Sequence, residues 1–167
     1  RLRERGACLC PTLVVLDDLE AIAFEQTRQQ QGLQEIPEPM KAAIRRMISA
    51  MEAVSRLCVR ILAAERVRLL VGQDGCDPSA TAREMRRMAA CGVPAVEILR
   101  GATLYPAEWL GADGRLGSIA PGKQADLVLL EADPLEEIGR VEAIVAVICR
   151  GRVALPANPR STADPGR

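Results

Sequence analysis

The sequence predicts an α/β fold from three observations. A long amphipathic helical pattern at 38–65 runs directly into the apolar segment VRLLVG at 67–72, and helix followed by buried strand is typical of a parallel sheet. Residues 113–155 are instead rich in glycine, turn residues and short apolar runs, which predicts β-structure. The chain has 167 residues, 49% of them hydrophobic, which is enough for a core. We therefore expect an α/β part at 1–112, a β-rich part at 113–155 and a disordered tail at 156–167.

The first predicted strand is the apolar run ACLCPTLVVL at 7–16. Proline cannot donate a hydrogen bond to a neighbouring strand, so Pro11 should end the strand proper near Cys10. The polar segment QTRQQQGLQEIPEP at 26–39 contains one glycine and two prolines. Such breakers predict a loop, either a mobile surface excursion or a loop over a site.

The long helix is predicted over 38–65, and its apolar residues are expected to pack in the core. These residues recur at steps of three and four: Met40, Ile44, Met47, Met51, Val54, Cys58, Ile61 and Leu62. Further elements follow at 67–72 (strand), 79–91, 95–101 and 106–110 (helices), 126–132 (strand) and 144–154 (two strands joined by a turn).

Composition excludes several classes of partner. Lys+Arg and Asp+Glu both number 22, so a nucleic acid or an anionic membrane is not expected, and no apolar run approaches the ~20 residues of a membrane span. With no leader peptide visible, the six scattered cysteines predict reduced thiols and a cytoplasmic protein, a disulfide framework being the alternative. None of them forms a C-x-x-C pair, and the chain has no histidine to complete a usual zinc site.

Asp74 is the candidate site residue, because it lies two residues beyond the predicted strand at 67–72. In a parallel α/β barrel the functional groups gather at the carboxyl ends of strands. Gly72 and Gly75 beside it allow tight turns and the close approach of a ligand. A carboxylate here could bind a metal or act as a general base on metal-bound water. Alternatively Asp74 closes a turn or caps the next helix, and spacing alone favours that reading.

Four segments, in order, resemble the carboxyl-terminal portion of metal-dependent amidohydrolases of the imidazolonepropionase and prolidase-like type. They are VRLLVGQDG, AREMRRMAACGVPAVEILRGATLYPAEWLG, LGSIAPGKQADLVLLEADPL and IVAVICRGRV. The resemblance covers residues 6–153. It implies the carboxyl-terminal part of a (β/α)8 TIM-like barrel, followed by part of a small β-sandwich. Within it Gln73 replaces a usual Thr, Ala82 a frequent His, and Tyr105 a common Asn.

The resemblance also implies a function. Asp74 would correspond to the aspartate that touches a divalent metal, expected to be zinc, and shuttles protons for the attacking water. The reaction would be hydrolysis of carbon–nitrogen bonds, either non-peptide or dipeptide-like amides, in a small-molecule substrate. The family's histidines would lie upstream, so the isolated chain is expected to be inactive. The alternative is a non-catalytic remnant that serves as a packing or oligomerisation module, and a homo-oligomer is compatible with both hypotheses.

Other chemistry-bearing residues have structural explanations. Lys123 lies in a Pro-Gly-Lys turn without the spacing of a phosphate loop. Asp126 is expected to close a turn, and Cys76 to be incidental, with a place in a substrate pocket as the alternative. Cys8 and Cys10 share a face of the first strand and are expected to pack in the core. The basic helix face of Arg83, Arg86 and Arg87 is expected to be solvated.

Overall fold

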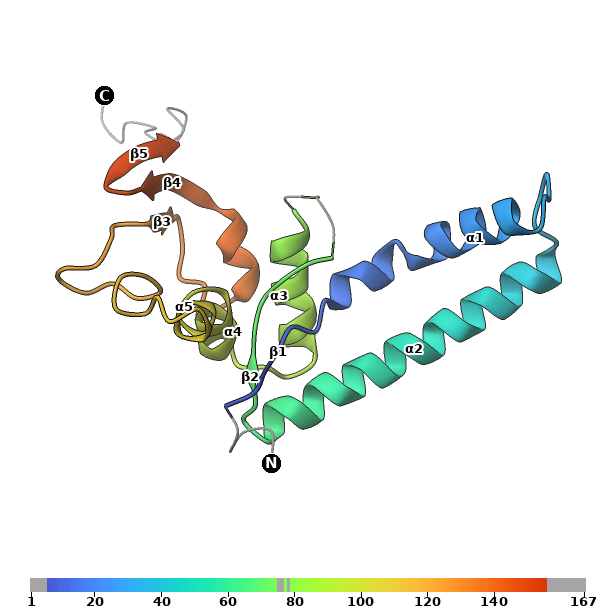
Figure 1. Cartoon of the computed structure of the whole chain (residues 1–167), viewed down its shortest axis with the longest axis horizontal. Helices are drawn as coiled ribbons and strands as arrows, with labels where there is room; N and C mark the ends of the chain where they lie inside the picture. The colour runs from blue at the N-terminus through green and yellow to red at the C-terminus, as the bar shows by residue number, and fades with distance from the viewer. Residues whose placement is uncertain (1–5, 75–76, 78, 156–167) are drawn as a thin grey trace, which may run out of the picture.

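The computed structural model describes residues 6–74, 77 and 79–155 (Figure 1). The predicted tail at 156–167 and the predicted roles of Gly75 and Cys76 lie outside these residues. The elements in chain order are β1 (Cys8–Leu9), the 3-10 helix η1 (Leu13–Asp17), α1 (Leu19–Gln30), α2 (Glu38–Ala64), β2 (Arg68–Leu69), α3 (Ala80–Ala90), α4 (Ala95–Ala102), α5 (Leu104–Trp109), β3 (Leu127–Leu130), the 3-10 helix η2 (Ile138–Glu142), β4 (Ile144–Cys149) and β5 (Arg152–Leu155). No helix in the described ranges is both long and apolar enough to cross a bilayer.

β1 and β2 form a parallel pair, as predicted, with Cys8 opposite Arg68 and Leu9 opposite Leu69. Both strands are shorter than predicted. After Pro11 the chain takes a left-handed turn at Thr12 (φ 47°) and continues as η1. The apolar run is still buried, because Leu13 and Val14 are covered within η1.

The predicted loop at 26–39 is wrong in its first part, because residues up to Gln30 belong to helix α1. Residues 19–31 contain no glycine or proline that would interrupt a helix. Within α1, Arg28 and Gln29 donate hydrogen bonds to Glu25. Helix α1 packs antiparallel along α2, and the two form a hairpin that projects from the rest of the molecule (Figure 1). The mostly polar sequence of α1 lacks the apolar periodicity from which a helix is usually predicted.

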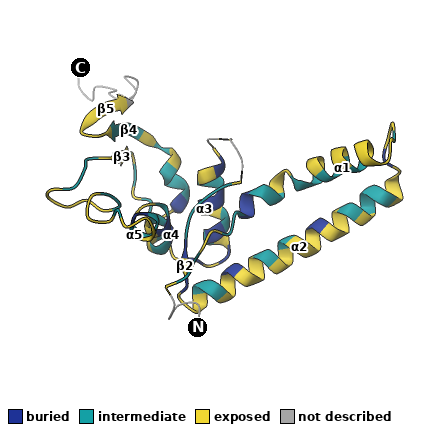
Figure 2. Ribbon diagram, in the orientation of Figure 1, coloured by how far each residue is buried: buried dark blue, intermediate teal, exposed yellow. Residues whose placement is uncertain are grey.

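The core lies where η1, the end of α2, β2, α3 and α4 meet. Its buried members are Leu13, Val59, Leu69, Met85, Met88, Cys91, Val93, Ile98 and Ile138. The expected core packing of the apolar residues of α2 is wrong for the five that the structure leaves exposed: Met47, Met51, Val54, Cys58 and Ile61. Helix α2 instead buries Ile48 and Val59, so its apolar stripe faces outward (Figure 2).

The β-rich part is an antiparallel sheet in the order β3-β4-β5, and the predicted hairpin at Arg150–Gly151 is confirmed. One sheet of this kind is present in the described ranges, so the β-sandwich stays a prediction. The sheet is attached through η2, where Ile138 is buried in the core. Arg86 of α3, expected to be solvated, forms an ion pair with Glu142 at the end of η2.

Candidate active site

The carboxyl ends of β1 and β2 meet at one edge of the parallel pair. The Leu70 N–H donates to the Leu9 carbonyl at 2.8 Å, which extends the pairing one residue past β2. The Val71 N–H then donates to the carbonyl of Gly101 in α4 at 3.0 Å, which fixes the direction in which the chain leaves the strand. Residues Gly72, Gln73 and Asp74 therefore follow directly from a hydrogen-bonded strand end.

Gly72 lies against Cys10 at this edge. A Cβ atom at Gly72 would sit 2.6 Å from the Cys10 Sγ, which is closer than any non-bonded contact allows. Partial desolvation by the surrounding groups raises the pKa of the Cys10 thiol even though the residue is exposed, and the Glu84 carboxylate adds to the rise, so this thiol stays protonated at neutral pH. The expected core packing of the first-strand cysteines is wrong, because Cys8 is half-buried and Cys10 is exposed.

Asp74 is exposed, while its neighbour Gln73 is half-buried with a covered Oε1 that has no hydrogen-bond partner. Within the described part of the chain, no hydrogen bond or ion pair involves Asp74. The turn before α3 is closed by Asp77, whose Oδ1 accepts the Ser79 N–H at 2.9 Å. Asp77 thus closes the turn directly before α3, and Asp74 is exposed at the strand end.

Charged side chains tie the segments around this edge together. Arg83 of α3 bridges Asp77 at 2.7 Å and Asp17 of η1 at 3.3 Å. Arg87 pairs with the same Asp17 and lies 3.4 Å from Glu52 of α2. The prediction that this basic face is solvated is wrong for Arg83 and Arg87, which are half-buried. Their ion pairs connect α3 to α2, to η1 and to the loop after β2.

Glu84 is a site-adjacent carboxylate that sequence reasoning missed. It is 0% exposed, and its Oε2 accepts the Val14 N–H at 2.7 Å. Burial raises the pKa of Glu84, although the backbone N–H groups of Leu13 and Val14 oppose the rise. The sequence signal for its burial is its position in α3: Glu84 lies four residues before Met88, so the two side chains share the apolar face of the helix. Glu84 thereby anchors the segment that follows β1.

The residues present do not fit a metal site on their own. In the ranges that the structure describes, no three His, Cys, Asp or Glu side chains gather closely enough to hold a metal ion. The whole sequence contains no histidine. A catalytic zinc uses three protein ligands, and Asp74 offers one carboxylate. A metal at this edge would need ligands from outside the described residues.

The turn predicted at Lys123 is confirmed, and Asp126 is bound to the turn between β4 and β5. The Lys123 Nζ donates to Ser118 Oγ at 2.6 Å and to the Asp113 carbonyl at 2.5 Å, so it braces a loop. The Asp126 Oδ1 accepts the Arg150 N–H at 2.7 Å, and this bond lowers the pKa of the Asp126 carboxyl group. Neither residue lies near the strand edge of Asp74 in sequence or in the sheet pairing.

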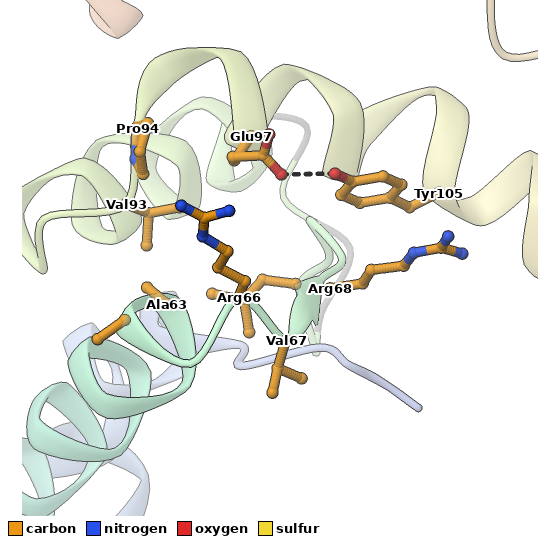
Figure 3. Close-up of a pocket in the computed structure, with 10 residues that line it drawn as sticks. Ala63, Arg66, Val67, Arg68, Val93, Pro94, Glu97 and Tyr105 are labelled. Atoms are coloured by element: carbon orange, nitrogen blue, oxygen red, sulfur yellow. Dashed lines mark hydrogen bonds between the residues drawn. The ribbon is translucent and has the colours of Figure 1, made fainter. Parts of the chain in front are cut away.

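A cavity of about 410 Å³ lies at the other end of β2 (Figure 3). Arg66, Arg68, Glu97 and Tyr105 line it together with apolar side chains. The Tyr105 hydroxyl donates to Glu97 Oε2 at 2.5 Å, as the dashed line in Figure 3 shows. Arg68 of the lining pairs with Glu108 outside it. The cavity lies at the amino end of the strand, opposite the end that carries Asp74.

Comparison with known proteins identifies relatives over most of the chain. The sequence profile described as "Amidohydrolase family" matches residues 24–154. N-acetylgalactosamine-6-phosphate deacetylase of Escherichia coli O157:H7 is 39% identical over 61 residues, which are 36% of this chain and 16% of that protein.

Solved structures match nearly the whole chain. A prolidase complexed with N-methylphosphonate-L-proline has a TM-score of 0.69 and 29% identity, over 93% of this chain and 36% of that one. A Xaa-Pro dipeptidase has a TM-score of 0.70 at 23% identity, covering 92% and 36%, which is a likeness of fold. The chain thus spans about a third of the length of these structures.

Proposed function

This chain belongs to the amidohydrolase family, and from that premise we propose that it is the carboxyl-terminal part of a metal-dependent hydrolase that cleaves carbon–nitrogen bonds. The observation that carries the proposal is the position of Asp74. It is an exposed carboxylate at the carboxyl end of a parallel strand, and Asp77 already performs the turn-closing role nearby. A mixed α/β arrangement that matches about 36% of longer hydrolase structures is consistent with part of a barrel.

Asp74 would act as a proton carrier in this reaction. Its carboxylate takes a proton from the attacking water, the oxygen adds to the amide carbonyl carbon, and the same proton passes to the leaving nitrogen as the C–N bond breaks. The products are a carboxylic acid and an amine. Exposure of Asp74 favours this role, because a carboxylate that faces solvent can approach the substrate.

The family generally uses divalent metals, and we expect zinc in the intact protein. Most of the ligands would come from outside the described residues, because these contain no cluster of three side chains that could hold a metal ion. Asp74 is the residue of this chain that we assign to that site.

The substrate is a small molecule with an amide or imide bond. Two classes have support: dipeptides of the Xaa-Pro type, because a prolidase matches 93% of the chain, and N-acetylated amino sugars, because a deacetylase matches 36% of it. The broader match makes dipeptides the first class to assay. The contrasting candidate is a non-catalytic module that packs or oligomerises, and the exposed apolar face of α2 favours it.

The DNA upstream of Arg1 separates the two functions. An in-frame His-x-His motif supports the hydrolase, whereas a start signal directly before Arg1 supports the module. Where upstream coding sequence exists, the longer protein should be assayed as wild type, Asp74→Ala and Asp77→Ala with both substrate classes. We expect Asp74→Ala to lower turnover at least ~10²-fold with little change in the unfolding midpoint.

Asp77→Ala is the matched control in this experiment. It removes a neighbouring carboxylate that binds Ser79 and Arg83, so it should lower the unfolding midpoint and leave most turnover intact. Retained turnover in Asp74→Ala together with lost stability would end the catalytic assignment of Asp74.

A further inference from the structure

The backbone hydrogen bonds that extend β2 end at Val71. Within the described ranges, no backbone hydrogen bond involves residues 72–74. The path of the chain from Val71 to Asp74 is therefore set by packing and not by strand pairing in this part of the structure. The close contact found there joins Gly72 to the Cys10 side chain.

Cys10 stands on a stretch of backbone that is held on both sides. One residue earlier, the Leu9 carbonyl accepts the Leu70 N–H at 2.8 Å, and β1 and β2 lie side by side (Figure 1). Four residues later, the Val14 N–H donates to the buried Glu84 at 2.7 Å. The backbone of Cys10 therefore has a defined place beside the end of β2, although the residue itself is exposed.

The absence of a side chain at Gly72 serves the Cys10 sulfur and not the backbone. The φ angle of Gly72 lies outside the left-handed region, so an alanine can adopt the same backbone conformation. A Cβ atom there would lie 2.6 Å from the Cys10 Sγ, and apart from its chain neighbours no other described residue comes within 4 Å of it. A methyl group at residue 72 and the sulfur would compete for one space, so either the sulfur turns aside or the two strand ends move apart.

We propose that the contact between Cys10 and Gly72 positions Asp74 for proton transfer. This inference rests on the proposed function, in which Asp74 carries a proton from the attacking water to the leaving nitrogen. Asp74 lies two residues beyond Gly72, so a displacement of Gly72 also displaces its carboxylate. Proton transfer needs donor and acceptor within hydrogen-bond reach, and a misplacement of about 1 Å can cost on the order of 10²-fold in rate. Cys10 and Gly72 are positioning residues and take no part in the reaction.

Steady-state kinetics of the longer protein assayed for the proposed function test this role. Gly72→Ala should lower kcat about tenfold or more and change KM little, because it displaces a proton carrier and removes no group that binds the substrate. Cys10→Ala removes the sulfur, so the double variant Gly72→Ala/Cys10→Ala should recover most of the lost kcat. Cys8→Ala is the matched control: it removes a sulfur from the same strand that does not contact Gly72, and it should recover nothing.

Thermal unfolding of the purified 167-residue chain tests the contact itself, without any activity. Overpacking should lower the unfolding midpoint of Gly72→Ala by several degrees, and the double variant with Cys10→Ala should regain that loss. An unchanged midpoint in Gly72→Ala would show that the sulfur turns aside freely, and it would overturn the proposal.

The same variants separate this inference from the proposed function. Slow turnover in Asp74→Ala together with wild-type kcat in Gly72→Ala would end the positioning role and leave the role of Asp74 standing. Full turnover in Asp74→Ala would end both. A loss in Gly72→Ala that Cys10→Ala does not restore would mean that the glycine acts through another neighbour, which also contradicts the proposal.

Discussion

Glu84 shows how one buried carboxylate shapes the strand edge on which Asp74 lies. Its Oε2 receives the Val14 N–H, while its Oε1 is buried with no hydrogen-bond partner. A covered charge that is half satisfied costs free energy, and the folded protein reduces this cost by holding the proton longer. The raised pKa of Glu84 is therefore a consequence of its anchoring role.

This reasoning predicts a pH-dependent effect of Glu84→Gln. Because the folded state binds the Glu84 proton more tightly than the unfolded state does, the contribution is fully present below the ordinary pKa of 4.5 and is lost as pH rises through the raised folded pKa. Glutamine keeps an acceptor for Val14 and does not titrate. Relative to wild type, the variant should thus gain stability between pH 4 and pH 7, by about 1.4 kcal/mol for each unit of upward shift.

Urea denaturation of both proteins at pH 4, 5, 6 and 7 measures this difference. Glu84→Ala is the companion variant, because it also removes the acceptor and should be less stable than Glu84→Gln at every pH. A stability difference between Glu84→Gln and wild type that is flat across the range would contradict the anchoring account.

The packing of α4 on β2 depends on a glycine. A Cβ atom at Gly101 would lie 2.2 Å from the carbonyl oxygen of Leu69, so the helix and strand could not keep their present spacing. Gly101→Ala should lower the free energy of unfolding by about 1–3 kcal/mol, the usual cost of overpacking, even though alanine favours helices. The control is Gly114→Ala, where nothing lies within 4 Å and the change should stay within ~0.5 kcal/mol. Equal effects of the two substitutions in thermal denaturation would sink the packing argument.

Elements with strong local signals could be predicted from the sequence, and those held by tertiary contacts could not. Helix α2 has an apolar repeat, prolines at its start and a change to the apolar segment VRLLVG after Arg66, so its range was correct to within a residue. Which face of it would be buried could not be predicted, because several rows of its surface are apolar. Helix α1 was missed because its stability comes from local polar bonds and from packing on α2, as in the ion pair of Arg45 with Glu20.

The same division holds for the candidate site. Asp74 could be singled out because it stands just past a buried strand and because the family resemblance assigns it to the site, whereas its spacing alone favours a turn or a helix cap. Burial of Glu84 could have been suspected from its place on the apolar face of α3, but its role could not, since that depends on Val14, which lies 70 residues away in the sequence. The sequence also could not show whether Asp74 or Asp77 closes the turn before α3, because both residues precede that helix.

At the scale of the whole molecule, the described residues form one parallel strand pair where a barrel has eight strands. Its core is built around β2, and the sheet of β3, β4 and β5 is attached through η2. Both features agree with a chain that spans about a third of the structures it matches. This arrangement places the candidate catalytic residue Asp74 at a strand end. The described residues do not form the other sides of a barrel active site.

The last prediction follows from that incompleteness: the purified 167-residue chain should not hydrolyse amides in a metal-dependent way. Three protein ligands are needed for a catalytic zinc, the sequence has no histidine, and the described residues hold no ligand cluster. The measurement strips the chain with a chelator, adds Zn²⁺, Mn²⁺ or Co²⁺ and follows amine release from Xaa-Pro dipeptides and N-acetyl amino sugars. Rates should equal those of metal alone, in wild type and Asp74→Asn alike. Metal-dependent turnover that disappears in Asp74→Asn would mean that this chain builds a complete site, because a contaminating enzyme would not respond to a substitution here.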